Sequence, residues 1–259
     1  MRRTPDAEVG ALAFAVGAFV LCLAGAALAG GIRVDDQLLP FVAAGAIAPG
    51  ISGICFTRAI RAAGAARTSV VVGAAPLVAV VIAIALLDEP AKAPLILGAL
   101  LIVAGGLVLL GERVRPHDFR LVGLWLGFAA CVMFATRDNL VRWLAGDTEV
   151  PALEAGATAA GTASVLLLAW IVSKRGGLRV ADVRPFALTA VLAGASYLAL
   201  FEAYYRGRVT IVSPLIATES LFGVLAAAIV FGRTELIGRH LIAGATLIVA
   251  GGALIGAFR

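Results

Sequence analysis

Long apolar stretches alternate with short polar connections along the whole chain of 259 residues. A helix needs roughly 20 consecutive apolar residues to cross the hydrocarbon core of a bilayer, which is about 30 Å thick. Stretches of about this length occur nine times, and charged or turn-forming residues close each of them. The pattern therefore predicts an all-α integral membrane protein with nine transmembrane helices. The predicted helices span residues 9–30, 38–60, 69–87, 93–111, 120–144, 151–173, 185–205, 212–232 and 238–258.

The composition is typical of a chain that is surrounded by lipid. Hydrophobic residues make up 61% of the chain and charged residues 14%, and the mean hydropathy is +1.03. An ordinary soluble domain is about 45–50% apolar and about 25% charged. This chain therefore has too little polar surface to cover a soluble core, and none of its connections is long enough to hold a separate soluble domain.

The chain contains an internal repeat with a shift of about 146 residues. The hexapeptide Leu101–Gly106 recurs unchanged as Leu247–Gly252. Further ordered matches at nearly the same shift are Gly98 with Gly244, Glu89 with Glu235, Glu8–Ala11 with Glu154–Ala157, and Pro40-Phe41 with Pro185-Phe186. Ordered matches of this kind indicate a duplicated membrane unit.

The duplication predicts two domains, residues 1–112 with four helices and residues 119–259 with five. The predicted helix 120–144 has no counterpart, because that counterpart would precede Met1. We therefore expect the first copy to lack its first helix, through a late start site, a truncated gene or a true nine-helix form. A complete unit has an odd number of helices, so the two copies form an inverted-topology repeat. The interface of such repeats near the bilayer midplane is the usual place for a transported substrate.

The first apolar stretch has an alternative interpretation as a secretory signal peptide. Arg2-Arg3 precedes it and Ala27-Leu28-Ala29 imitates a cleavage site. The stretch is long for a signal and has a partner in the second copy, which favours a membrane helix.

Short segments in a fixed order occur in both copies. In the first copy they are residues 56–61, residues 64–69, Ala75-Pro76-Leu77, Leu87–Pro90 and Gly98–Gly111. In the second copy they are Ala217–Phe222, Phe231–Glu235 and Gly244–Gly252. In this order they resemble the EamA-type transporters of the drug/metabolite transporter superfamily, with Ser220 where the family's Glu-Pro stretch has proline. The resemblance covers almost the whole chain. It implies two five-helix repeats and a secondary transporter of amino acids, metabolites or drugs, commonly an exporter with proton coupling or facilitated exchange.

Basic residues predict the orientation in the membrane. The N-terminus and the connections on its side carry about twice as many Lys and Arg residues as the opposite side. The positive-inside rule then places the N-terminus in the cytoplasm and the C-terminus outside. The resemblance implies instead that both ends of a ten-helix chain are cytoplasmic, so the side of the C-terminus stays open. We expect a multi-pass protein of a bacterial inner (plasma) membrane.

Glu219 is the foremost candidate for the substrate or coupling site. An ionisable group inside a membrane helix costs several kcal/mol unless it is paired or hydrated, so by default it marks a pathway. Glu219 lies about 9 Å beyond Ser213 at 1.5 Å per helical residue, between Thr218 and Ser220. We expect Glu219 to exchange a proton or to contact a cationic group, with Ser220 lining the cavity. The alternative is a carboxylate that only joins two helices.

The predicted helix 185–205 carries two further candidates, Tyr197 and Glu202. Tyr197, Phe201 and Tyr204 fall on one helix face and could line a pocket for an apolar or aromatic solute. Glu202 lies one turn from the helix end and could reach either the cavity or the membrane surface. The alternative for Tyr204 and its neighbour Tyr205 is an aromatic belt at the surface.

Polar residues also crowd the second half of the predicted helix 120–144. Asp138 and Arg142 have the spacing of a helical ion pair, Arg137 precedes them, and the uncharged Asn139 could bond a substrate. The alternative is that the helix leaves the membrane at this point.

Glycine and proline predict packing and helix breaks. Gly98 and Gly105, like Gly244 and Gly251, are seven residues apart, so each pair shares a helix face on which two backbones can approach closely. Pro49-Gly50 interrupts the hydrogen bonding of the second predicted helix.

The chain has no Walker-type loop, no Ser/His/Asp constellation and no cluster with metal-ligand spacing. We therefore expect no enzymatic activity, no catalytic residue, no metal and no cofactor. Cys22, Cys55 and Cys131 each lie within an apolar stretch, which favours neither disulfides nor a zinc site. Basic residues are not interleaved with aromatic ones, so nucleic acid is not an expected partner.

The sequence is thus interpreted as a secondary transporter that moves a small organic solute by alternating access. Its expected partners are the lipid bilayer and the solute, while proton coupling and a homodimer stay open. The alternative is a non-transporting protein, truncated or serving as a scaffold, that keeps the same fold.

Overall fold

The computed structural model describes residues 6–30, 34–63, 68, 71–109, 120–218, 222 and 239–258, and these residues form helices joined by short connections. Five helical stretches in this part of the chain are long and apolar enough to cross a membrane: Ala7–Ala29, Asp36–Ala63, Val122–Asp147, Ala152–Arg175 and Val180–Arg206. Shorter apolar helices are Ala75–Leu86, Ala93–Val108 and Thr246–Ile255. The prediction of an all-α membrane protein is confirmed.

The chain divides into two compact units, and each takes helices from both predicted repeats. The first unit consists of Met1–Arg58 and Thr136–Arg206, and the second of Ala59–Ala135 and Gly207–Arg259. Helices α3 (Ser52–Ala63) and α7 (Val122–Asp147) contribute to both units. The other elements of the first unit are α1 (Ala7–Ala29), η1 (Asp36–Leu38), α2 (Leu39–Gly45), η2 (Ala46–Ile51), α8 (Ala152–Arg175), α9 (Val180–Val183), η3 (Arg184–Phe186) and α10 (Ala187–Arg206).

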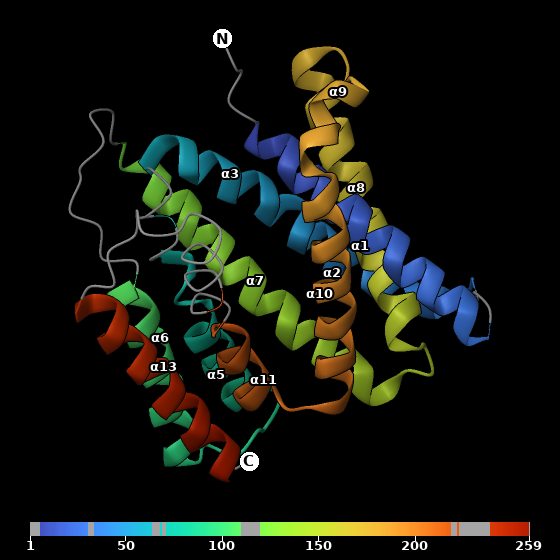
Figure 1. The fold of residues 1–259 in the computed structure, drawn as a ribbon. Helices are drawn as coiled ribbons and strands as arrows, with labels where there is room; N and C mark the ends of the chain where they lie inside the picture. Colours follow the sequence, from blue (N-terminus) through green and yellow to red (C-terminus); the bar gives the residue numbers. More distant parts are fainter. Residues whose placement is uncertain are drawn as a thin grey trace. The chain divides into compact units, whose positions relative to one another are not determined.

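Helices α1 and α8, which are matched elements of the predicted repeats, lie side by side in the first unit (Figure 1). A Cβ atom on Gly25 would lie 3.3 Å from Leu153, and one on Gly161 would lie 3.0 Å from the Phe19 ring. Residue numbers rise along one helix as they fall along the other, so the two helices are antiparallel. The Asp6 side chain accepts a hydrogen bond from the N–H of Glu8 and caps the start of α1.

The second predicted helix is interrupted where proline and glycine occur. The backbone at Ala48 leaves the helical region with φ of −148° and ψ of 129°, next to Pro49. Just before this break, Gly45 packs directly on the backbone of Ala159 in α8. A side chain at Gly45 would collide with that backbone, which explains why a glycine occupies this position.

The second unit also contains α5 (Ala75–Leu86), α6 (Ala93–Leu109), α11 (Val209–Ile216) and α13 (Arg239–Phe258). Within the predicted helix 69–87, residues 71–72 are helical, a turn follows at 73–74, and α5 then begins with Pro76 in its first turn. Pro suits this position because the first turn of a helix needs no N–H donor from it. Most of the predicted helix 212–232 lies outside the described residues.

Helices α6 and α13, a second matched pair, also pack side by side in antiparallel directions (Figure 1). A Cβ atom on Gly251 would lie 2.6 Å from the carbonyl oxygen of Gly98, and one on Gly105 would lie 2.6 Å from that of Gly244. Glycine therefore lets the two backbones approach closely, as the sequence predicts. The fully buried Ile102 packs beside these glycines.

Glu89 fixes the start of α11 in the second unit. Its Oε1 accepts the N–H of Val209 at 2.8 Å, and its Oε2 accepts the N–H of Thr210 at 2.9 Å. The carboxylate is buried and comes from the connection between α5 and α6. The first N–H groups of a helix have no acceptor within the helix, and the carboxylate accepts from two of them. Its negative charge is also attracted by the positive N-terminal end of the helix dipole.

Candidate substrate-binding site

Charged and polar side chains are buried in the second half of α7. The Nε of Arg137 lies 2.8 Å from the Oδ1 of Asp138, and these side chains are 8% and 11% exposed. Asn139 is buried as well. These side chains are therefore enclosed by protein rather than exposed on the surface of the first unit.

The pairing of Asp138 with Arg142 that their spacing allows does not form. Asp138 pairs with its neighbour Arg137 instead. The Nη1 of Arg142 donates to the carbonyl oxygens of Tyr204 and Tyr205, each at 3.3 Å. These carbonyls end α10 and lack helical partners, so a guanidinium is well suited to them.

One face of α10 supplies aromatic side chains to the same region. Tyr197, Phe201 and Tyr204, which share this face, are all fully buried. The Tyr197 ring contacts Phe201 at a centroid distance of 5.0 Å and meets Phe14 of α1 edge-on at 6.0 Å. For Tyr204, a place in an aromatic belt at the membrane surface is wrong, because its side chain has no exposed area.

The aromatic face adjoins the ion pair of α7. The guanidinium of Arg137 lies 5.7 Å from the ring centroid of Tyr197. The Tyr204 side chain lies beside the carboxylate of Asp138. Helices α7 and α10 therefore bring a cation, an anion and two phenol groups together within the first unit, and the buried Asn139 follows the ion pair on α7. We call Arg137, Asp138, Asn139, Tyr197 and Tyr204 the polar cluster.

The five predicted site residues have different outcomes. The polar cluster includes two of them, Tyr197 and Asn139. The carboxylate of Glu202 is instead paired with Arg206 of the same helix at 2.7 Å, with the Glu202 side chain 31% exposed. Glu219 and Ser220 lie outside the described residues.

Sequence reasoning did not select Glu154 as a candidate. Glu154 is buried in the first turn of α8, and its Oε2 has no hydrogen-bond partner among the described residues. The Glu154 carboxylate therefore lies inside the first unit, near Tyr205. The repeat carried the signal, because Glu154 matches Glu8 and both lie in the first turn of an apolar helix.

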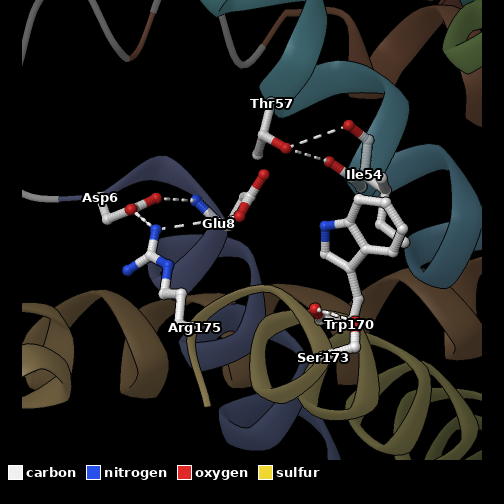
Figure 2. Close-up of polar contacts among 8 residues, drawn as sticks. Asp6, Glu8, Ile54, Thr57, Trp170, Ser173 and Arg175 are labelled. Carbon is white, nitrogen blue, oxygen red and sulfur yellow. Dashed lines mark hydrogen bonds and ion pairs between the residues drawn. The ribbon is translucent and has the colours of Figure 1, made fainter. Parts of the chain in front are cut away.

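The matched residue Glu8 has a cation nearby (Figure 2). Arg175, in the last turn of α8, pairs with Asp6 and lies 3.8 Å from the Oε2 of Glu8. Glu154 lies at the other end of the α1–α8 pair, next to the last turn of α1. That turn has no basic residue, so α1 does not provide Glu154 with a cation as α8 provides Arg175 for Glu8. The two matched carboxylates therefore have different surroundings.

Comparison with known proteins identifies the family. The sequence profile of the EamA-like transporter family matches residues 1–111 and 121–257. The chain belongs to the EamA-like transporter family. One solved crystal structure, described only as that of a protein, aligns over 100% of this chain and 91% of its own, with a TM-score of 0.80 and 20% sequence identity. That likeness shows the fold alone. No curated protein matches the chain.

The family match confirms the resemblance to EamA-type transporters that the order of the short segments indicated. EamA-like proteins are secondary transporters of small solutes and not enzymes, so this chain is a multi-pass membrane transporter. Within the described residues, no group of three or more His, Cys, Asp and Glu side chains is placed to hold a metal ion.

Proposed function

We propose that this EamA-like transporter exports a small organic solute, such as an amino acid, a metabolite or a drug, across a bacterial inner membrane. Transport proceeds by alternating access of two inverted repeats, residues 1–112 and 119–259. Two observations support this proposal. The matched helices α1 and α8 are antiparallel, and so are the matched helices α6 and α13, which is the relationship that opposite membrane orientations require.

The polar cluster is the proposed contact site for the solute. Placing charged groups inside a membrane protein is costly, and such groups usually face a pathway or one another. The Arg137–Asp138 pair carries no net charge, while the rings of Tyr197 and Phe201 provide an apolar wall. Such a site suits a solute with an apolar body, polar ends and no net charge.

Hydrogen-bonding groups of the cluster would set the solute's orientation. The Asn139 amide can both donate and accept, and phenol hydroxyls do the same. Sites of this type reject solutes that leave their buried polar groups unpaired. The buried polar groups of α7 and α10 are the single observation that carries the assignment of the site.

Glu219 is the proposed coupling carboxyl, and Ser220 and Glu202 are proposed to line the route of the solute. Glu219 follows Thr218 in the apolar segment after α11. A carboxyl group in such a segment can carry a proton across the membrane and release it on the other side.

Solute flux in liposomes tests the proposed function. The purified chain is reconstituted and given a panel of amino acids, nucleosides and cationic drugs, with and without a pH gradient. We expect flux of at least one solute above that of protein-free liposomes. Folded protein that moves none of them under either condition would favour the non-transporting scaffold.

A further inference from the structure

Two cationic side chains from different helices meet at one tryptophan of the first unit. The guanidinium carbon of Arg58 in α3 lies 4.4 Å from the ring centroid of Trp170 in α8. The Nζ of Lys174, one turn further along α8, lies 5.1 Å from the same centroid. Figure 2 shows Trp170 beside Ile54 of α3. The ring thus fixes two cations near one point through cation–π attraction.

Neither cation is neutralised by an acidic side chain among the described residues. Both Arg58 and Lys174 are exposed. The adjacent Arg175 differs, since it pairs with Asp6 and lies near Glu8. Trp170 therefore has two positive charges beside it, because Arg and Lys are both protonated at neutral pH.

Exposed apolar side chains continue from this charged point toward the middle of the two helices. Ile51, seven residues before Arg58, is 47% exposed, and Leu166, four residues before Trp170, is 36% exposed. A Cβ atom on Gly50 would lie 3.1 Å from Leu166, so η2, which leads into α3, adjoins α8 at this level. Residues spaced by four and by seven share a helix face. Basic side chains are thus followed by an apolar seam.

The position along the helices corresponds to the membrane surface. Trp170 lies five residues before the last residue of α8, about 7.5 Å at 1.5 Å per residue. Tryptophan is enriched at this depth, and the positive-inside rule assigns the basic ends of α3 and α8 to the cytoplasm. The cytoplasmic leaflet carries anionic lipids, and each nearby Lys or Arg adds to their attraction.

We propose that Arg58, Trp170 and Lys174 form a binding site for the headgroup of an anionic phospholipid. The lipid phosphate is held by the two cations, and an acyl chain lies along Ile51 and Leu166. The charge of the site matches the phosphate, and the apolar seam matches the chain. This proposal does not depend on transport, because it concerns the surface of the folded protein.

Native mass spectrometry of the full chain in detergent tests the site, with phosphatidylglycerol and phosphatidylcholine as probes. The test variant combines Arg58→Gln and Lys174→Gln. The matched control combines Arg179→Gln and Arg184→Gln, which removes two exposed cations from the connection after α8, on the same side of the membrane. The exchange variant Arg58→Lys with Lys174→Arg keeps both charges.

We expect wild type, control and exchange variant to retain phosphatidylglycerol in preference to phosphatidylcholine. The test variant should bind phosphatidylglycerol roughly 30-fold more weakly, the effect of two surface cations at about 1 kcal/mol each. Equal retention by the test variant and wild type would overturn the proposal, and so would an equal loss in the control. Competition by glycerol 3-phosphate at the concentration of the lipid would also overturn it, since the site would then bind a free phosphate.

Discussion

Arg137 and Asp138 are sequence neighbours on α7 that pair with each other inside the protein, with 2.8 Å between Nε and Oδ1. The pairing brings two opposite charges into the low-dielectric interior together. It also leaves the remaining guanidinium N–H groups and the second carboxylate oxygen for other contacts, in a region lined by Tyr197 and Tyr204. A buried neutral pair is therefore the chemical centre of the proposed site.

Replacing only one member of this pair should destabilise the fold strongly. Arg137→Gln leaves the Asp138 carboxylate buried without its cation, and such a loss costs about 3–5 kcal/mol of unfolding free energy. The double variant Arg137→Met with Asp138→Leu should lose less, because no unpaired charge remains. Unfolding in mixed micelles measures the difference, with exposed Arg184→Gln as control. A single variant as stable as the control would contradict the importance of the pair.

Neighbouring glycines of α13 should respond in opposite ways to alanine. Gly251→Ala places a Cβ atom 2.6 Å from the carbonyl oxygen of Gly98, whereas Gly252 has no atom within 4 Å of the same position. Gly251→Ala should cost about 1–3 kcal/mol through overpacking. Gly252→Ala should be neutral or slightly stabilising, because alanine is the better helix former. Equal melting temperatures for the two variants would show that α6 and α13 are not closely packed.

Removing the carboxylate of Glu89 should loosen the start of α11. Glu89→Ala leaves the N–H groups of Val209 and Thr210 without their acceptors, at a cost of about 1–3 kcal/mol for each buried group. Glu89→Gln keeps one acceptor oxygen and should lie between wild type and Glu89→Ala. Asp88→Asn, an exposed neighbour, serves as control. Hydrogen exchange at residues 209 and 210 reports the effect, and unchanged protection in Glu89→Ala would argue against the cap.

Sequence patterns predicted the helices and their close contacts well. Long apolar stretches located α1, α8 and α10, and glycine spacing identified the faces of α6 and α13 on which another backbone packs closely. These features depend on local composition and on the repeat, both of which are visible along the chain.

The partners of the polar residues were harder to predict. Asp138 and Arg142 have the spacing of a helical ion pair, but Arg142 donates hydrogen bonds to the carbonyl oxygens at the end of α10 instead. That helix end is about 60 residues away in the sequence. The surroundings of Glu202 and Glu154 depend on which helices pack together, and a single sequence does not contain that information. The shared face of Tyr197, Phe201 and Tyr204 was visible in the sequence because their spacing of four and seven residues is that of one helix face.

Coupling to protons makes a separate prediction at Glu219. Glu219→Gln removes the group that would bind and release a proton, so flux driven by a pH gradient should disappear while exchange of solute across the membrane persists. Flux assays in liposomes with and without the gradient distinguish the two modes. Full gradient-driven flux in Glu219→Gln would exclude this carboxyl as the coupling group.

The apparent KM for the transported solute tests the proposed site most directly. Tyr197→Phe keeps the ring and removes the hydroxyl, and Asn139→Leu replaces the amide with an apolar group of similar size. Each should raise KM roughly tenfold, the effect of about one lost hydrogen bond in a buried site. Trp143→Phe, an exposed change on the same helix α7, should leave KM unchanged. If both site variants fold and transport with the KM of wild type, the polar cluster does not contact the solute.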